Sequence, residues 1–110
     1  MSDQNFTDLP IELYNDTQVE NDLPLFIKVE DQLRALARGH TDITSASVNL
    51  TQPSENNTTP HIFEATVIAY MRPKNIVATE KAGDLEGALR GALQAVERQV
   101  REQRGRLRNY

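Results

Sequence analysis

Apolar residues recur at helical spacing in two segments of the chain. The first segment begins after Asp22, a suitable N-cap, and Pro24 lies in the first turn, where proline is tolerated. Gly39 is a suitable residue to close it. Its apolar positions fall on one face: Leu25, Phe26, Val29, Leu33 and Leu36. This spacing predicts an amphipathic helix over residues 22–39.

The second helical segment follows Asp84, again a residue type favoured at helix N-caps. Its apolar face consists of Leu85, Leu89, Ala92, Leu93, Val96 and Val100. Gly83, Gly87 and Gly91 recur at a spacing of four beside small alanines. This arrangement favours close packing of the helix over a phosphate-binding loop, which would follow a strand.

Four other segments have the character of strands. Residues 11–15 (IELYN) alternate apolar and polar, residues 43–51 are rich in β-branched residues, and residues 61–70 and 76–79 continue the pattern. Residues 72–75 (RPKN) predict a turn between the last two strands, and residues 53–60 predict a polar loop. The predicted order is therefore β-α-β-β-β-α.

This order predicts an α+β fold, a two-layer sandwich whose four-stranded sheet is mainly antiparallel. Both helices are expected to cover one face of the sheet, leaving the other face to solvent or a partner. The length of 110 residues fits a single domain, expected over residues 11–108 and preceded by a mobile acidic segment, residues 1–10.

Composition narrows the possible functions. The chain has no cysteine, which excludes disulfides and thiolate chemistry, and its start lacks the features of a signal peptide. We therefore expect a soluble, cytoplasmic protein. Its two histidines, His40 and His61, lie in no recognisable catalytic or metal-ligating spacing. The expectation is a protein that is not an enzyme and uses no metal, cofactor or small-molecule substrate.

The charge of the chain is distributed unevenly. The formal net charge is −4, yet residues 1–60 carry ten acidic and three basic residues, whereas residues 61–110 carry six acidic and nine basic residues. Such asymmetry indicates that one side of the folded protein is basic although the protein as a whole is acidic. This basic side could bind a polyanion. The candidate nucleic-acid-binding residues are Lys28, Arg34, Arg38, Arg72, Lys74, Lys81, Arg90, Arg98, Arg101, Arg104 and Arg108.

Four arginines of the second helix, Arg90, Arg101, Arg104 and Arg108, fall near one another on a helical wheel. A row of guanidinium groups suits phosphate oxygens along an RNA backbone. The alternative is that arginines stabilise the helix itself, since Glu86 precedes Arg90, and Glu97 precedes Arg101, by four residues. The charge pattern alone leaves both readings open. The RNA reading requires that the cations of both helices and of the turn at 72–75 form one continuous positive surface.

Three segments together carry a family resemblance: FEATVIA at 63–69, IVATEKAGDLEGAL at 76–89 and AVERQVREQ at 95–103. With the helix after Asp22, they make the chain resemble the ribosome hibernation-promoting factors, also called ribosome-associated inhibitors or ribosomal subunit interface proteins, in their short form. The chain departs from the family in having Glu86 where an aromatic residue is common.

The resemblance implies a domain that binds the small ribosomal subunit in the channel for messenger and transfer RNA, touching rRNA and neighbouring ribosomal proteins. It would block translation by occupancy, without catalysis, and we expect it to be monomeric when free and to bind no membrane. The alternative is a protein-interaction module of the same fold. Such a module would bind a basic protein partner through its acidic first half and the open face of its sheet.

Overall fold

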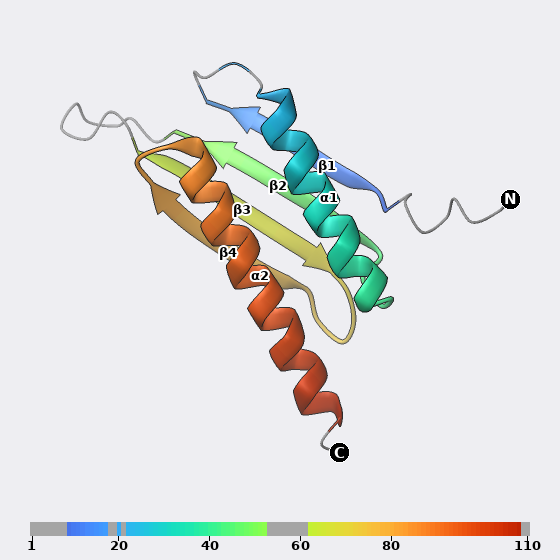
Figure 1. Ribbon diagram of the computed structural model, residues 1–110. Helices are drawn as coiled ribbons and strands as arrows, with labels where there is room; N and C mark the ends of the chain where they lie inside the picture. The colour runs from blue at the N-terminus through green and yellow to red at the C-terminus, as the bar shows by residue number, and fades with distance from the viewer. Residues whose placement is uncertain (1–8, 18–19, 21, 53–61, 109–110) are drawn as a thin grey trace, which may run out of the picture.

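The chain folds into one sheet covered by two helices on a single face (Figure 1). The computed structural model describes residues 9–17, 20, 22–52 and 62–108. Its elements are β1 (Ile11–Asp16), α1 (Leu23–Gly39), β2 (Ser45–Thr51), β3 (Phe63–Tyr70), β4 (Ile76–Ala82) and α2 (Leu85–Arg108). The predicted order β-α-β-β-β-α and the α+β class are therefore confirmed.

The four strands lie in the order of the sequence, β1-β2-β3-β4. β1 pairs with β2 in parallel, with Leu13 opposite Val48, because α1 carries the chain back before β2 begins. The other two pairs are antiparallel: Val48 lies opposite Val67, and Val67 lies opposite Ala78. The prediction of a mainly antiparallel sheet is confirmed.

The predicted starts of two strands were each two residues too early. β2 begins at Ser45 rather than residue 43, since the N–H of Ile43 donates to the carbonyl of His40 in a turn. β3 begins at Phe63 rather than residue 61. β4 begins at Ile76 as predicted, and its antiparallel pairing with β3 continues to Ala82 opposite Phe63. The N-terminal segment 1–8 and the loop 53–60 lie outside the described residues.

Both helices begin at the predicted caps. In α1 a side-chain oxygen of Asp22, Oδ1, accepts from the N–H of Leu25 at 3.2 Å, and in α2 Oδ1 of Asp84 accepts from the N–H of Gly87 at 2.8 Å. These bonds satisfy N–H groups that lack partners within a helix.

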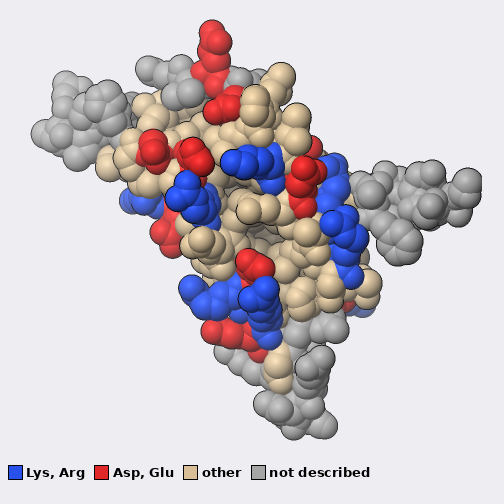
Figure 2. All heavy atoms as spheres, in the orientation of Figure 1, with Lys and Arg blue, Asp and Glu red and all other residues tan. Residues whose placement is uncertain are grey.

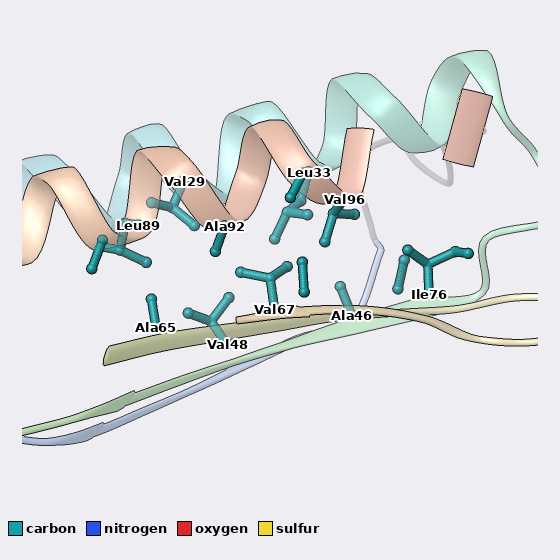
Figure 3. Packing of buried hydrophobic residues seen from close by; sticks show 14 of the residues in the cluster. Val29, Leu33, Ala46, Val48, Ala65, Val67, Ile76, Leu89, Ala92 and Val96 are labelled. Atoms are coloured by element: carbon teal, nitrogen blue, oxygen red, sulfur yellow. The ribbon is translucent and has the colours of Figure 1, made fainter. Parts of the chain in front are cut away.

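Side chains from the two helices and the inner face of the sheet interdigitate in one core (Figure 3). Val29 and Leu33 of α1, and Leu89, Ala92 and Val96 of α2, point toward the sheet. In β3 every second residue is buried, so the strand contributes Phe63, Ala65, Val67 and Ala69. The alternation of a strand thus gives the sheet one apolar face and one face directed away from the helices.

The second face of the sheet, which we call the open face, is mostly polar. It carries the alternate residues of each strand: Glu12, Tyr14, Asp16, Ser45, Ser47, Asn49, Thr51, Glu64, Thr66, Ile68, Tyr70, Val77, Thr79 and Lys81. Thr66 and Thr79 share a hydrogen bond of 2.9 Å between their hydroxyls on β3 and β4.

Within the described residues, no helix is both long and apolar enough to cross a bilayer.

Candidate nucleic-acid interface

The second helix is longer than the sheet it covers. At 24 residues α2 is about 36 Å long, whereas the seven residues of β4 span about 24 Å. The last turns of α2 therefore project past the sheet, beyond the turn that joins β3 to β4 (Figure 1). This geometry places the arginine-rich end of the chain in an exposed position.

One neutral residue fastens this part of α2 to the β3–β4 turn. Nε2 of Gln103 donates to the carbonyl of Lys74 at 3.4 Å and to that of Arg72 at 3.5 Å. The Gln103 side chain is only 7% exposed. Within the turn, Oδ1 of Asn75 accepts from the N–H of Met71 at 3.1 Å. The exposed residues Arg72 and Lys74 are thereby held beside the helix.

Five described cations lie on the parts of α1, α2 and the β3–β4 turn nearest this end of the molecule, which we call the basic end: Arg38, Arg72, Lys74, Arg98 and Arg101. Arg38 lies in the last turn of α1, next to Gly39 and His40, and these two residues share a groove with Arg101 of α2. Arg104 and Arg108 follow within the same helix, but their side chains lie outside the described part of the structure. The basic end combines two helix ends and one hairpin.

A groove of about 350 Å³ runs between the two helices and opens on their outer surface. Figure 2 shows this hollow, with basic and acidic side chains interspersed around it. α1 contributes Gln32, Leu36 and His40 to its lining, and α2 contributes Leu93, Arg90, Glu97 and Arg101. A smaller hollow nearer the start of the helices is lined by Lys28 and Glu86. Cations and carboxylates alternate along the groove, so its net charge is small.

Three arginines are paired with glutamates one helical turn away. Arg90 lies 3.1 Å from Glu86, and Arg101 lies 2.8 Å from Glu97. Both pairs were predicted from their spacing. Arg34 also lies 3.5 Å from Glu30, a pair that the sequence analysis overlooked although the spacing is the same. Exposed pairs of this kind stabilise a helix by about 0.2 to 0.5 kcal/mol each.

The structure does not bring all the candidate residues into one continuous positive surface. Lys81 lies on the open face of the sheet, opposite Glu64. Alternate residues of β4 point away from the helices, and Lys81 is one of them. Arg34 points to the β1 side of α1, where its partner Glu30 lies. Lys28 and Arg90 line the first half of the groove. The expected single surface was wrong: the cations divide among the basic end, the groove and two other places.

Charge is instead polarised along the helices. α1 and α2 run in the same direction (Figure 1), and both begin at the end of the molecule that carries Asp16, Asp22, Glu64, Asp84 and Glu86. We call it the acidic end. The arrangement complements the helix dipoles, whose positive ends face the acids and whose negative ends face the basic end. The polarisation is partial, because Lys81 lies opposite Glu64 at the acidic end, and Glu97 and Glu102 lie beside Arg101 at the basic end.

Among the described residues, no three histidine, aspartate or glutamate side chains lie close enough together to hold a metal ion. What the basic end can do is present several exposed cations, fixed by two helices and a hairpin, to an anionic surface.

The role of Gln103 at the β3–β4 turn was not predicted from the sequence. Its position, three residues after Val100 and seven after Val96, continues the apolar face of α2. A polar residue at such a position indicates a buried hydrogen-bonding role, since buried polar groups need partners.

Comparison with known proteins gives the family. A model of the family described as "Sigma 54 modulation protein / S30EA ribosomal protein" matches residues 17–108. No curated protein sequence matches the chain significantly.

Two solved structures share the fold. The Thermus thermophilus Protein Y N-terminal domain is 20% identical, with a TM-score of 0.68, and the match covers 86% of this chain and 98% of that one. A ribosomal subunit interface protein from Coxiella burnetii is 12% identical, with a TM-score of 0.70, covering 88% of this chain and 99% of that one. The resemblance inferred from the three sequence segments is confirmed. Because the family model matches most of its length, this chain belongs to the Sigma 54 modulation protein / S30EA ribosomal protein family.

Proposed function

We propose that this protein is a ribosome-associated hibernation factor that binds the small ribosomal subunit in the channel for messenger and transfer RNA. The basic end, held together by Gln103, meets rRNA phosphates, and the protein blocks translation by occupying the channel. It acts without catalysis, in the cytoplasm. Family membership and the name of the Coxiella protein support association with ribosomes.

Because the cations do not form the one continuous surface that was expected, family membership carries the proposal, and the cations of the basic end are the surface that we assign to the contact. Arg98 is exposed on α2, and the sequence from Arg98 onward contains five arginines and one glutamate. The Gln103 bonds hold the backbone of Arg72 and Lys74 beside the same helix. Arginine binds phosphate oxygens through its planar fork regardless of base sequence. A surface of this kind suits folded rRNA, whose backbone is the feature most exposed.

The groove has a secondary part in this proposal. Arg90 and Arg101 are paired with Glu86 and Glu97, so part of their charge is already compensated. Among the described residues, the cations of the basic end that form no ion pair are Arg38, Arg72, Lys74 and Arg98, so this end is the main contact, and Lys28 and Arg90 of the groove flank it.

Co-sedimentation with purified small subunits tests the proposal. Arg98→Glu should reduce the amount that pellets, and the double variant Arg98→Glu, Arg101→Glu should abolish pelleting. Lys81→Glu is the matched control, because it makes the same charge change at an exposed residue on the opposite face of the sheet. Equal pelleting of wild type and the double variant would contradict the proposal. Salt-tolerant binding to a basic protein, indifferent to these changes, would favour the alternative of a protein-interaction module.

A further inference from the structure

The first strand leaves one edge of the sheet open. β1 pairs with β2 on one side, and on its other side no strand lies among the described residues. β4 is the other terminal strand, and its outer side likewise has no strand beside it among the described residues; what distinguishes the β1 edge is the surface next to it. An uncovered edge presents backbone groups that another extended chain can pair with.

A groove lined by four apolar and two polar residues runs beside this open edge. It has a volume of about 480 Å³ and lies between the helix-facing side of β1 and the flank of α1. Its lining consists of Leu13, Asn15, Leu23, Phe26, Ile27 and Glu30. Leu23 is 63% exposed and Ile27 is 56% exposed, and they lie one turn apart on the same helix. Single exposed apolar residues are common, but two of them beside a hollow and a free strand edge form a surface.

The other side of β1 is acidic. Its residues are alternately half-buried and exposed, so Glu12, Tyr14 and Asp16 point to the open face while Leu13 points to the groove. Further exposed acids, Glu20 and Asp22, lie just after the strand. The cation on this flank of α1, Arg34, is paired with Glu30. A chain added to the edge would therefore meet apolar contacts on one of its faces and carboxylates on the other.

We propose that the β1 edge binds an extended segment of another protein in which apolar residues alternate with lysine or arginine. The segment adds as a fifth strand, its apolar side chains filling the groove against Leu13, Leu23 and Ile27, its basic side chains beside Glu12 and Asp16. In strand addition the backbone bonds supply general affinity, and alternate side chains supply specificity. Because side chains of β1 alternate between the groove and the open face, the side chains of the partner segment must alternate between apolar and basic.

A second copy of this chain fits the edge poorly. Antiparallel self-pairing of β1 would bring Glu12 and Asp16 of one copy toward the same carboxylates of the other, and like charges on neighbouring strands repel. The same carboxylates attract a basic strand. Charge complementarity therefore selects a basic partner over self-association.

The proposal does not rest on the proposed function, since β1 and the basic end use different residues. The probe is a labelled peptide of alternating valine and lysine, about eight residues long, matched to a six-residue edge. Two control peptides are a block sequence of the same composition and an alternating valine–glutamate sequence. Binding is followed by fluorescence anisotropy, and the site by amide chemical shifts.

The alternating valine–lysine peptide should shift the amides of residues 11–16 and 22–30. The block peptide should bind about tenfold more weakly, and the glutamate peptide should not bind. Ile27→Glu should weaken binding by about tenfold or more. Val77→Glu is the matched control, because Val77 is 50% exposed but lies on β4, and it should leave binding unchanged. Arg98→Glu should also leave it unchanged, which separates this result from the rRNA proposal.

Three results would overturn the proposal. Equal binding of the alternating and block peptides would reduce the interaction to charge alone. Amide shifts confined to residues outside β1 and α1 would place the peptide elsewhere. A concentration-dependent dimer in sedimentation that Ile27→Glu abolishes and the peptide fails to dissociate would show that a second copy occupies the edge.

Discussion

Gln103 donates its side-chain amide to the carbonyl of Lys74, 3.4 Å away and 29 residues earlier in the chain. The bond joins the last part of α2 that packs on the sheet to the turn that carries Arg72 and Lys74. A neutral, buried side chain thus bonds to the backbone of the turn that carries two exposed cations.

Gln103→Ala should lower the free energy of unfolding by about 1 kcal/mol, because it removes the hydrogen bonds to two turn carbonyls. Amide exchange at Met71 and in residues 72–75 should accelerate. The measurements are urea unfolding and hydrogen exchange. Gln94→Ala, an exposed glutamine of the same helix, is the control and should change neither. Indistinguishable values for the two variants would mean that the contact does not fasten the turn.

Binding to small subunits should weaken steeply with salt, because each phosphate contact releases counterions. The logarithm of the association constant should fall with the logarithm of salt concentration by about 0.7 to 0.9 per phosphate neutralised. Arg98→Gln should make this slope shallower by about one such step. Filter binding at several salt concentrations measures the slope. Lys81→Gln, on the open face, should leave it unchanged, and a change as large as that for Arg98→Gln would contradict the assigned interface.

Glu97→Gln should affect stability and binding in opposite directions. The variant removes the 2.8 Å pair with Arg101, so the free energy of unfolding should fall by about 0.2 to 0.5 kcal/mol. The released guanidinium becomes available to phosphate, so small subunits should bind more tightly. Thermal unfolding and co-sedimentation test the two effects. The comparison is Glu86→Gln, which breaks the equivalent pair nearer the acidic end and should strengthen binding less. Weaker binding by Glu97→Gln would contradict the prediction.

The phenol of Tyr14 donates a hydrogen bond of 3.0 Å to Oε1 of Glu12 on the open face. This bond, with the charge of the Glu12 carboxylate, raises the pKa of Tyr14 above its usual value of 10.0. A raised pKa in the folded state means that the stabilisation is present below pH 10 and lost as the pH rises through the folded pKa. Glu12→Gln should lower the pKa of Tyr14, measured by an NMR titration of the ring carbons. An unchanged value would mean that the bond is absent in solution.

Local patterns in the sequence were sufficient to predict the order of the helices and strands and the N-cap residues of both helices. Asp22 and Asp84 cap helices as predicted, since an N-cap bond spans three residues and needs no tertiary context. The pairs Glu86–Arg90 and Glu97–Arg101 followed from spacing for the same reason. The starts of β2 and β3 were predicted less accurately, because where a strand begins depends on pairing with a strand that lies elsewhere in the sequence.

The sequence by itself determined the order of elements, the apolar face of each and the family, because these depend on short-range periodicity and on residues in a fixed order. Only the tertiary structure decided which cations lie together. Lys81 precedes the first residue of α2, Leu85, by only four residues. Its side chain nevertheless faces away from the helices, since the side chains of a strand alternate between the two faces of a sheet. Arg72 and Arg98 are far apart in sequence, yet both lie toward the basic end, because the apolar face of α2 packs along β3 and β4 as far as the turn that joins them. The net charge of a sequence segment does not predict which cations lie near one another, because that depends on how distant segments pack together in the fold.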